Sequence, residues 1–498
     1  MGRRVLRALE SESVTVWMAT QAAHGQAVAV VVPLAQVDRA EAAIEQELEL
    51  ELERHEVEPV DIRKPVTLLS LVAEQIRDTE NIAGRFFQAL GGVGVNVIAI
   101  GQGESSRSIS CVIDQEDTRL AVRTVHAAFN FAHQDVNLCV LGKGVVGSQL
   151  LEQIRTQKAK LEEQHDVAIN VVALADSSRV VFDENGLAIE RWSELLEQSE
   201  PTEDAPATVE DVLERLPRLS VPVIVDDTAE SGMEQLYLDA FDHGVHVVAA
   251  NKKPLTSSYA AHQELMRAAR ESHRAFQYET TVGASLPVVD TLKNLVRTGD
   301  RVLLVEGAFS GTLGYLTNEV MKGVSLSEAV RTAKELGYTE PRPQDDLSGL
   351  DVARKALILA RELGLELELD DIDVEPLVPQ ELIETETLEE FFSELEAHDP
   401  EFDAYVQGIK DENKTLRYLA IIDPGIDGNE ARFQVGPVAV EQEHPATRLR
   451  GSESFVAFTT ERYQDYPLIV QGAGAGGAVT AAGVLSDILR ISQNLRGR

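Results

Sequence analysis

From residue 137 onward, short apolar runs alternate with longer stretches of helical periodicity. The apolar runs predict strands at 137–142, 167–175, 221–226, 245–249 and 275–279. The amphipathic stretches predict helices at 145–164, 208–216, 231–243 and 257–272. Because strands joined through helices pair in parallel, this α/β region is predicted to be a Rossmann-type doubly wound parallel sheet.

The first 134 residues have a different pattern, which repeats with a spacing of 81 residues. Each copy reads helix, alternating strand, a turn after a glutamine, a second alternating strand and a helix, the last at about 35–53 and 116–132. An apolar strand at 65–74 precedes the second copy, which completes a ferredoxin-like β-α-β-β-α-β order. The first copy has no such strand before it. The matched positions include Leu9 with Leu90, Val14 with Val95, and Gln21 with Gln102.

Between 287 and 455 the strands become polar on one face and helices lie between them, which predicts a second, α+β domain. The glycine-rich residues 472–477 and a final helix at 478–493 are expected to return to the nucleotide-binding region. We therefore expect three parts: 1–134, 135–286 completed by 456–498, and 287–455.

The charge of the chain excludes several classes of partner. A net charge of −38 over 498 residues opposes binding to nucleic acid and to anionic membrane surfaces. No apolar run approaches the length of a membrane helix, and the first residues lack an apolar signal core. Both cysteines, Cys111 and Cys139, fall in predicted strands, which favours a reducing cytoplasm. The acidity suits either a salt-rich habitat or an ordinary acidic bacterial protein.

A glycine motif follows the first strand of the α/β region. Gly142, Gly144 and Gly147 have the Gly-x-Gly-x-x-Gly spacing, with a long helix directly after them. In such a site the glycines let the backbone approach a pyrophosphate, and the helix N-terminus supplies amide donors, here including Val145 and Val146. The glycines of LGGVGVN (90–96) lie inside the repeat and are expected to form a turn.

The end of the next strand leaves the cofactor preference open. Asp176 stands where a carboxylate binds ribose hydroxyls, which favours NAD. Ser177, Ser178 and Arg179 suit a 2′-phosphate, which favours NADP.

Lysines and carboxylates gather at two later points. Lys252 and Lys253 follow the fourth strand, at the sheet edge where such folds bind ligands. Asp351 and Lys355 stand four residues apart on a helix, and Lys355 lies about 60° from the centre of the apolar stripe. An ordinary ion pair explains the spacing, but a lysine at the edge of a buried face indicates a cleft or an interface.

Four segments together resemble homoserine dehydrogenase, most closely the dehydrogenase part of bifunctional aspartokinase/homoserine dehydrogenases. They are NLCVLGKGVVG (137–147), HVVAANKKPLT (246–256), YTEPRPQDDLSGLDVARK (338–355) and IVQGAGAGGAVTAAGVLSDIL (469–489). The resemblance implies reversible, NAD(P)H-dependent reduction of L-aspartate 4-semialdehyde to L-homoserine. It assigns acid/base catalysis to Lys355 with Lys252 beside it, the substrate ammonium to Glu340, Asp346 and Asp351, and the nicotinamide end to Asn251, Lys252 and Gly474.

The segment YETTVGASLPVVDTLKNL (278–295) resembles the family's site for a monovalent cation, Na⁺ or K⁺. The resemblance assigns the ion to backbone carbonyls of Glu279, Val282, Ala284 and Leu286. Ser285 replaces the second glycine of the usual pattern, which costs strain if that position needs a positive φ.

The repeat resembles tandem ACT domains, small effector-binding modules. The resemblance implies threonine binding near Gln102 and Gln21, and a homo-oligomer, either a dimer or a tetramer. The aspartokinase half of the bifunctional proteins is missing, which suggests a fragment, a truncated gene model or a separate aspartokinase partner.

Two other classes of function fit the sequence less well. A phosphorylating semialdehyde dehydrogenase needs an exposed cysteine, which neither cysteine provides. A regulator that senses amino acids and nucleotides without catalysis could use the same folds, but it would not need two lysines and three carboxylates together.

Overall fold

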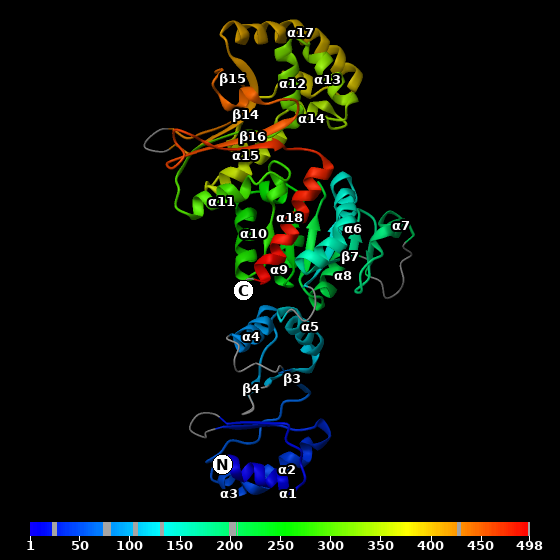
Figure 1. Cartoon of the computed structure of the whole chain (residues 1–498), viewed down its shortest axis with the longest axis vertical. Helices are drawn as coiled ribbons and strands as arrows, with labels where there is room; N and C mark the ends of the chain where they lie inside the picture. The colour runs from blue at the N-terminus through cyan, green and yellow to red at the C-terminus, as the bar shows by residue number, and fades with distance from the viewer. Residues whose placement is uncertain are drawn as a thin grey trace. The chain divides into compact units, whose positions relative to one another are not determined.

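A computed structural model describes residues 1–21, 27–72, 81–102, 108–129, 134–198, 206, 208–425 and 430–496 (Figure 1). The chain divides into two compact units. The first comprises Met1–Asp135 with Arg218–Ser220, and the second comprises Val136–Pro217 and Val221–Arg498. Each unit is described in turn.

The first unit confirms the repeated order of helix, strand, strand and helix. Its first copy comprises α1 (Gly2–Ser11), β1 (Met18–Gln21), β2 (Val28–Val31), α2 (Val37–Glu47) and α3 (Glu49–Glu53). Its second copy comprises β3 (Val66–Val72), α4 (Ile82–Gly92), β4 (Ala99–Gln102), β5 (Ser108–Asp114) and α5 (Thr118–Ala128). The single helix expected at 35–53 is therefore two helices, which meet at Leu48.

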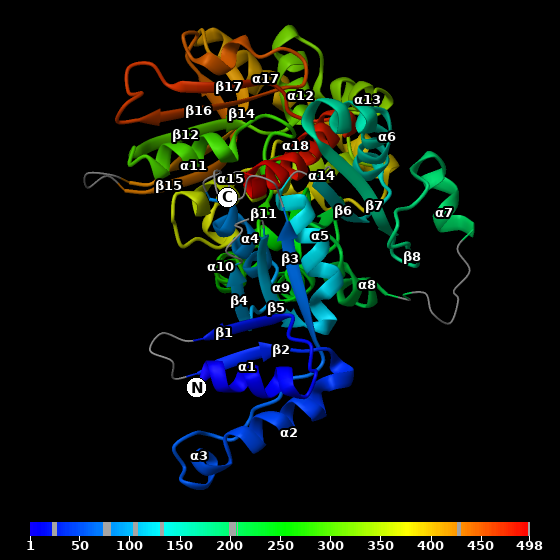
Figure 2. The same cartoon turned by 60° about the horizontal axis from the view of Figure 1, so that its bottom comes forward.

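The strands of the first unit form two small antiparallel sheets, β1-β2 and β3-β5-β4 (Figure 2). Phe86 and Leu90 of α4 pack with Cys111 and Ile113 of β5 in a buried core. The order β3-β5-β4 is that of the first three strands of a ferredoxin-like sheet. Within the described residues, no fourth strand pairs with it, and β6 (Gln134–Leu141), the next strand along the chain, belongs to the nucleotide-binding sheet.

The second unit begins with the predicted nucleotide-binding sheet, whose strand order is β11-β10-β9-β6-β7-β8. The strands are β6 (Gln134–Leu141), β7 (Val167–Ala175), β8 (Val180–Phe182), β9 (Pro222–Asp226), β10 (His246–Ala249) and β11 (Phe276–Gln277). β9 pairs in parallel with both β6 and β10, and β10 pairs in parallel with β11. β8 is an antiparallel edge strand that the hydrophobic pattern did not predict, because it is only three residues long.

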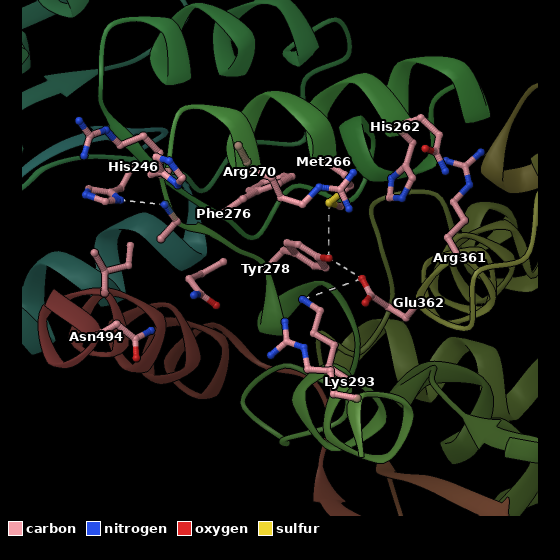
Figure 3. Close-up of a pocket in the computed structure, with 18 of the residues that line it drawn as sticks. His246, His262, Met266, Arg270, Phe276, Tyr278, Lys293, Arg361, Glu362 and Asn494 are labelled. Atoms are coloured by element: carbon pink, nitrogen blue, oxygen red, sulfur yellow. Dashed lines mark hydrogen bonds and ion pairs between the residues drawn. The ribbon is translucent and has the colours of Figure 1, made fainter. Parts of the chain in front are cut away.

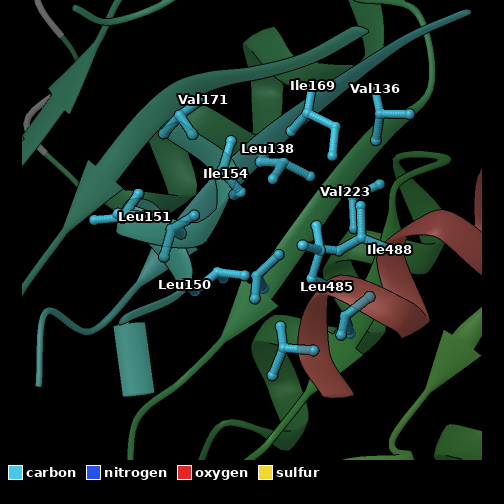
Figure 4. Packing of buried hydrophobic residues seen from close by; sticks show 14 of the residues in the cluster. Val136, Leu138, Leu150, Leu151, Ile154, Ile169, Val171, Val223, Leu485 and Ile488 are labelled. Carbon is cyan, nitrogen blue, oxygen red and sulfur yellow. The ribbon is translucent and has the colours of Figure 1, made fainter. Parts of the chain in front are cut away.

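Four helices of this sheet lie as predicted: α6 (Val145–His165), α8 (Val209–Arg215), α9 (Glu234–Asp242) and α10 (Tyr259–Glu271). A short helix, α7 (Trp192–Gln198), was not predicted. A further helix, α18 (Gly477–Arg496), comes from the end of the chain. Figure 1 shows α18 beside α6, and Figure 4 shows Leu150 and Ile154 packed among strand residues together with Leu485 and Ile488. The final helix therefore completes the core of the first sheet.

The second sheet of this unit has the order β13-β15-β14-β12-β16-β17. Its strands are β12 (Val302–Ala308), β13 (Asp373–Val374), β14 (Thr415–Asp423), β15 (Arg432–Val440), β16 (Glu453–Thr460) and β17 (Leu468–Ala473). Apart from the parallel pair β13-β15, the neighbouring strands are antiparallel. The helices are α11 (Val289–Arg297), α12 (Gly311–Lys322), α13 (Leu326–Glu335), α14 (Pro343–Leu347), α15 (Leu350–Glu362), α16 (Gln380–Ile383) and α17 (Leu388–Asp411).

The second sheet corrects one expected boundary. We expected residues from 456 onward to return to the nucleotide-binding region, but β16 and β17 pair with β12 in the second sheet. The return therefore comes later, with α18. The apolar pattern shows that 453–473 contains strands, but it does not show which sheet they join.

The structure offers no candidate for a membrane span: among the described residues, no helix is both long enough and apolar enough to cross a bilayer.

Candidate active site

Lys355 lies one turn into α15, and its ammonium is held from two sides. Its Nζ is 2.6 Å from Oδ2 of Asp351 and donates to the carbonyl of Phe309 at 2.7 Å. The Lys355 side chain is 12 % exposed, as expected for a lysine at the edge of a buried face. Gly349 precedes the helix with φ of 75°, and a Cβ there would come 2.0 Å from the hydroxyl of Tyr418. Only glycine therefore allows α15 to begin so close to β14.

Lys252 reaches the same carboxylate from the other sheet. It follows β10, and its Nζ is 3.3 Å from Oδ1 of Asp351. The adjacent Asn251 is buried and donates to Asp226 at 3.1 Å and to the carbonyl of Glu230 at 2.9 Å. Asn251 thus anchors the loop that presents Lys252, and its own amide is engaged within the protein.

The two lysines and Asp351 form an unequal electrostatic cluster. Burial favours the neutral form of Asp351, but the nearby ammonium groups outweigh burial and hold the pKa of Asp351 well below its usual range. Burial lowers the pKa of Lys355, and Lys252 lowers it further, although Asp351 opposes both effects. Two positive charges therefore share one carboxylate, which leaves the cluster with a surplus positive charge.

Of the other predicted substrate carboxylates, Asp346 lies in the site and Glu340 contributes mainly through its backbone. Asp346 accepts a hydrogen bond from the Glu340 amide at 2.8 Å. Burial, with smaller contributions from the charges of Glu340 and Asp351, raises the pKa of Asp346 to about 6. Glu340 itself is exposed, and within the described residues its carboxylate pairs with neither lysine.

The glycine motif has the geometry of an open anion-binding loop. Gly142 has φ of 93°, and a Cβ at Gly147 would come 2.0 Å from the Gly142 carbonyl oxygen. A Cβ at Gly144, by contrast, would meet no protein atom within 4 Å. α6 begins at Val145, which is 73 % exposed, and continues through Val146. The first amides of this helix are therefore directed toward open space beside Gly144.

At the end of β7, Asp176 is paired with a residue that the sequence did not single out. Its Oδ2 is 3.1 Å from Nζ of Lys143, the second residue of the glycine motif. Its Oδ1 accepts from the amides of Ser178 and Arg179 at 2.9 and 3.0 Å. Burial opposes ionisation, but these hydrogen bonds and Lys143 prevail and lower the pKa of Asp176 to about 2.

Arg179 is directed away from the glycine motif, since its guanidinium donates to the carbonyl of Leu196 at 2.7 Å. The motif therefore offers a lysine, rather than this arginine, beside Asp176. Lys143 could have been found from its place between Gly142 and Gly144.

Glycines between β17 and α18 bring the second sheet close to the glycine motif. A Cβ at Gly474 would come 1.9 Å from Oγ of Ser454, and a Cβ at Gly477 would come 2.4 Å from Cγ1 of Val145. Gln153 of α6 donates to the carbonyl of Ala478 at 2.7 Å. The N-termini of α6 and α18 therefore lie side by side.

The segment predicted to hold a cation is tightly ordered. The Glu279 carboxylate accepts hydrogen bonds from the backbone amides of Val289 and Asp290, at 2.8 and 2.9 Å. The carbonyls of Glu279 and Leu286 accept from the amides of Val282 and Val288, at 3.3 and 2.8 Å.

Ser285 does not meet the condition under which it would cost strain. The positive φ values in this segment belong to Gly283 at 82° and Ala284 at 55°. The substitution of serine for glycine at 285 therefore adds no such strain, because the turn takes its unusual geometry earlier.

Sequence reasoning also missed Asp227, which follows β9 directly. Both of its carboxylate oxygens are buried without a hydrogen-bond partner, and one would lie 3.6 Å from a Cβ at Gly147. Burial, with a smaller contribution from Asp226, raises the pKa of Asp227 to about 8. No periodic signal distinguishes this aspartate from Asp226.

The cysteines offer no nucleophile. Both are fully buried free thiols, and burial raises the pKa of Cys111 to about 11 and that of Cys139 to about 12. A neutral buried thiol is unreactive, which agrees with the exclusion of a cysteine-dependent dehydrogenase.

In the first unit, Gln21 ends β1 and is exposed, whereas Gln102 ends β4 opposite Ile109. Residues 103–107, on which the comparison of the two effector sites depends, lie outside the described residues.

Comparisons with known proteins agree with this geometry. Residues 287–489 match the model of the homoserine dehydrogenase family, and residues 142–279 match that of its NAD-binding domain. Residues 69–129 match an ACT domain. The second copy of the N-terminal repeat, the glycine motif and the lysine-bearing helix therefore each fall within a matched region.

Among curated relatives, a bifunctional aspartokinase/homoserine dehydrogenase of Haemophilus influenzae is 39% identical over 99% of this chain and 60% of its own length. One from Arabidopsis thaliana is 35% identical over 98% of this chain and 53% of its own length. The chain thus spans little more than half the length of these relatives.

A homoserine dehydrogenase of Schizosaccharomyces pombe is 35% identical over 73% of this chain and 96% of its own length. The crystal structure of homoserine dehydrogenase from Thermoplasma acidophilum shares the fold, with a TM-score of 0.54 over 72% of this chain and 99% of that one, at 23% identity. The chain belongs to the homoserine dehydrogenase family.

Proposed function

We propose that this chain catalyses the reversible reduction of L-aspartate 4-semialdehyde to L-homoserine with NADH or NADPH. The single observation that carries the proposal is the meeting of Lys355, Lys252 and Asp351, since Asp351 lies 2.6 Å from one lysine and 3.3 Å from the other. Lys252 comes from the loop after β10 of the first sheet and Lys355 from helix α15, which packs against the second sheet, and the glycine motif belongs to the same compact unit.

In this proposal the cofactor's pyrophosphate lies against Gly142, Gly144 and Gly147. It accepts hydrogen bonds from the backbone amides in the first turn of α6. Asp176 and Lys143 face the adenine ribose, with Arg179 behind them. Asn251, Lys252 and Gly474 border the nicotinamide. The bound cofactor supplies or accepts the hydride. The open space around Gly144 and the exposed N-terminus of α6 fit such a group.

Lys355 is the proposed proton donor. A lysine ammonium has three N–H bonds, and two of them are engaged by Asp351 and by the carbonyl of Phe309. The third is available to the aldehyde oxygen, where negative charge develops during reduction. Lys252 adds a second positive charge near that oxygen. The lowered pKa of Lys355 brings its proton affinity closer to a useful range.

The substrate's ammonium group is proposed to lie against Asp346 and Glu340, with Asp351 holding Lys355 in place. We further propose that the carbonyls of Glu279, Val282, Ala284 and Leu286 hold a monovalent cation. The support for this is the tight turn around Gly283 and Ala284, which aligns this short segment beside α18.

The proposed activity is tested by following NAD(P)H absorbance with homoserine as substrate. Lys355→Ala should lower the turnover rate by about 10²–10⁴-fold, the usual contribution of a positioned proton donor. NADPH binding, measured by fluorescence titration, should be retained.

A matched pair of variants distinguishes a specific role of Lys252 in the proposed site from a general effect of positive charge in its loop. Lys252→Ala should also lower turnover, whereas Lys253→Ala in the same loop should not, because the ion pair with Asp351 is made by Lys252. Near-normal turnover of Lys355→Ala would contradict the assignment of Lys355 as the proton donor. Equal losses in the two loop variants would contradict the role proposed for Lys252.

We also propose that the ACT repeat binds L-threonine as an effector, mainly at Gln102, and that the protein works as a homo-oligomer. Gln102 lies at a strand end in a three-stranded sheet, whereas Gln21 lies at the end of a two-stranded one.

A further inference from the structure

A cavity of about 630 Å³ lies between α10, α11, α15 and the end of α18 in the second unit (Figure 3). None of the predicted catalytic, substrate or cofactor residues lines it. Its lining is basic, although the chain as a whole carries a net charge of −38. Five lysine or arginine side chains and three histidines face a single carboxylate, that of Glu362.

The one carboxylate is already engaged. Glu362 accepts a hydrogen bond from the hydroxyl of Tyr278, and its Oε1 is 3.9 Å from Nζ of Lys293. Lys293 also lies over the Tyr278 ring, 3.8 Å from its centroid. Glu362 therefore neutralises at most one of the positive charges around the cavity.

Two of the basic residues, Arg270 and Arg297, are exposed arginines at the rim of the cavity lining. Within the described part of the chain, no carboxylate pairs with Arg270 or with Arg297. Each lies in the last turn of its helix, α10 or α11, where a cation is favourable near the helix carbonyls. That effect accounts for one arginine per helix. It does not account for their convergence with Lys293 and His262 on one cavity.

His262 adds a neutral polar ring to the lining of the cavity. It is 7 % exposed and lines the cavity, and its Nδ1 is buried without a hydrogen-bond partner. Burial, together with the charges of Arg361 and Lys293, lowers the pKa of His262 to about 4, so the ring is neutral at pH 7. A neutral imidazole can donate one hydrogen bond to an anionic oxygen, here from Nε2, because Nδ1 is closed to solvent.

We propose that this cavity binds a small organic or inorganic anion with two or more negative charges, held by Arg270, Arg297 and Lys293 and by a hydrogen bond from His262. Its size is that of a small-molecule site. Phosphate groups and carboxylates share the required chemistry, and guanidinium groups suit both.

The test is calorimetric titration of the full chain at constant ionic strength, with excess NADPH present so that the glycine motif does not compete. Pyrophosphate and citrate are titrated separately, which distinguishes phosphate from carboxylate ligands. At least one should bind to the wild type. The double variant Arg270→Gln with Arg297→Gln should weaken that binding at least about tenfold, a loss of about 1.4 kcal/mol.

Arg267→Gln is the matched control. Arg267 lies one turn earlier on α10, pairs with Glu264 and does not line the cavity. Its removal changes the net charge by the same amount as Arg270→Gln alone and should leave the affinity unchanged. If the double variant is unstable, Arg270→Gln alone should weaken binding in the same direction.

The proposal is overturned if neither probe binds the wild type, if the double variant binds as tightly, or if Arg267→Gln loses as much affinity. A failure of the proposed dehydrogenase activity would not mimic these results, because Arg270 and Arg297 are outside the site that contains Lys355.

Discussion

At the scale of single residues, the protein depends on charged groups whose neighbours change their protonation. Asp351 stays ionised because two ammonium groups surround it, whereas Asp227 is buried without a partner. The first arrangement holds Lys355 in position. The second is a cost to folding, since a buried carboxylate without hydrogen bonds is unfavourable.

Asp227 provides a prediction about stability. Its pKa of about 8 in the folded chain is above the usual value of 3.8, so the folded state binds the proton more tightly than the unfolded state does. Stability should therefore fall as the pH rises from about 4 toward 8. Asp227→Asn removes this titration and should stabilise the protein by about 1–3 kcal/mol at pH 8, with a smaller gain at pH 5.

The measurement is the urea midpoint of the cofactor-free protein at the two pH values. Asp176→Asn is the control with the opposite sign, because the pKa of Asp176 is lowered to about 2 and its ionised form is hydrogen-bonded. That variant should lose stability at pH 7. A gain for Asp227→Asn that is equal at pH 5 and pH 8 would contradict the titration argument.

At the scale of elements, the turn between β6 and α6 contains one glycine that packing requires and one that faces the proposed ligand site. Gly147 has no room for a side chain, because a Cβ there would come 2.0 Å from the Gly142 carbonyl oxygen. Gly144 faces open space. Two glycines of one motif are therefore required for different reasons.

Substitutions at the two positions should cause different defects, a loss of stability at Gly147 and a loss of cofactor binding at Gly144. Gly147→Ala should destabilise the second unit by about 1–3 kcal/mol, as overpacking does. Gly144→Val should leave the melting temperature unchanged but weaken NADPH binding at least about tenfold, since its side chain would fill the space proposed for the pyrophosphate. Fluorescence titration and thermal melting together check both. Unchanged NADPH affinity in Gly144→Val would mean that the loop is not the cofactor site.

At the scale of the whole molecule, a repeat that includes an ACT domain and a unit of the homoserine dehydrogenase family lie on one chain. Threonine can control the dehydrogenase only if it binds more tightly to one of two states of the protein. If the proposed effector site is at Gln102, Gln102→Ala should blunt threonine inhibition more than Gln21→Ala does.

Inhibition curves of homoserine oxidation against threonine measure this difference. Gln115→Ala serves as the control, because Gln115 is an exposed glutamine of the same unit that follows β5 rather than a strand-end turn. Wild-type activity that is indifferent to millimolar threonine would contradict the effector proposal, and a larger effect at Gln21 would reverse the ranking of the two sites.

Much of the fold could be read from local pattern. In the nucleotide-binding sheet, every strand except β8 was predicted within a few residues, and so were the helices α6, α8, α9 and α10. Such prediction is possible because buried strands are continuous apolar runs and surface helices have an apolar stripe. The 81-residue spacing likewise predicted the two similar halves of the first unit. These features depend on neighbours in sequence, so periodicity is enough to find them.

Other features depend on which distant segments meet. The spacing of four residues on one helix already placed Lys355 beside Asp351, but only tertiary packing brings Lys252, from the loop after β10, to the same carboxylate. The sequence also did not show that β16 and β17 join the second sheet, that Lys143 pairs with Asp176, or that basic residues from three helices line one cavity. Pairing partners, burial and the pKa values that follow from them are properties of contacts between segments far apart in the chain, which no local pattern contains.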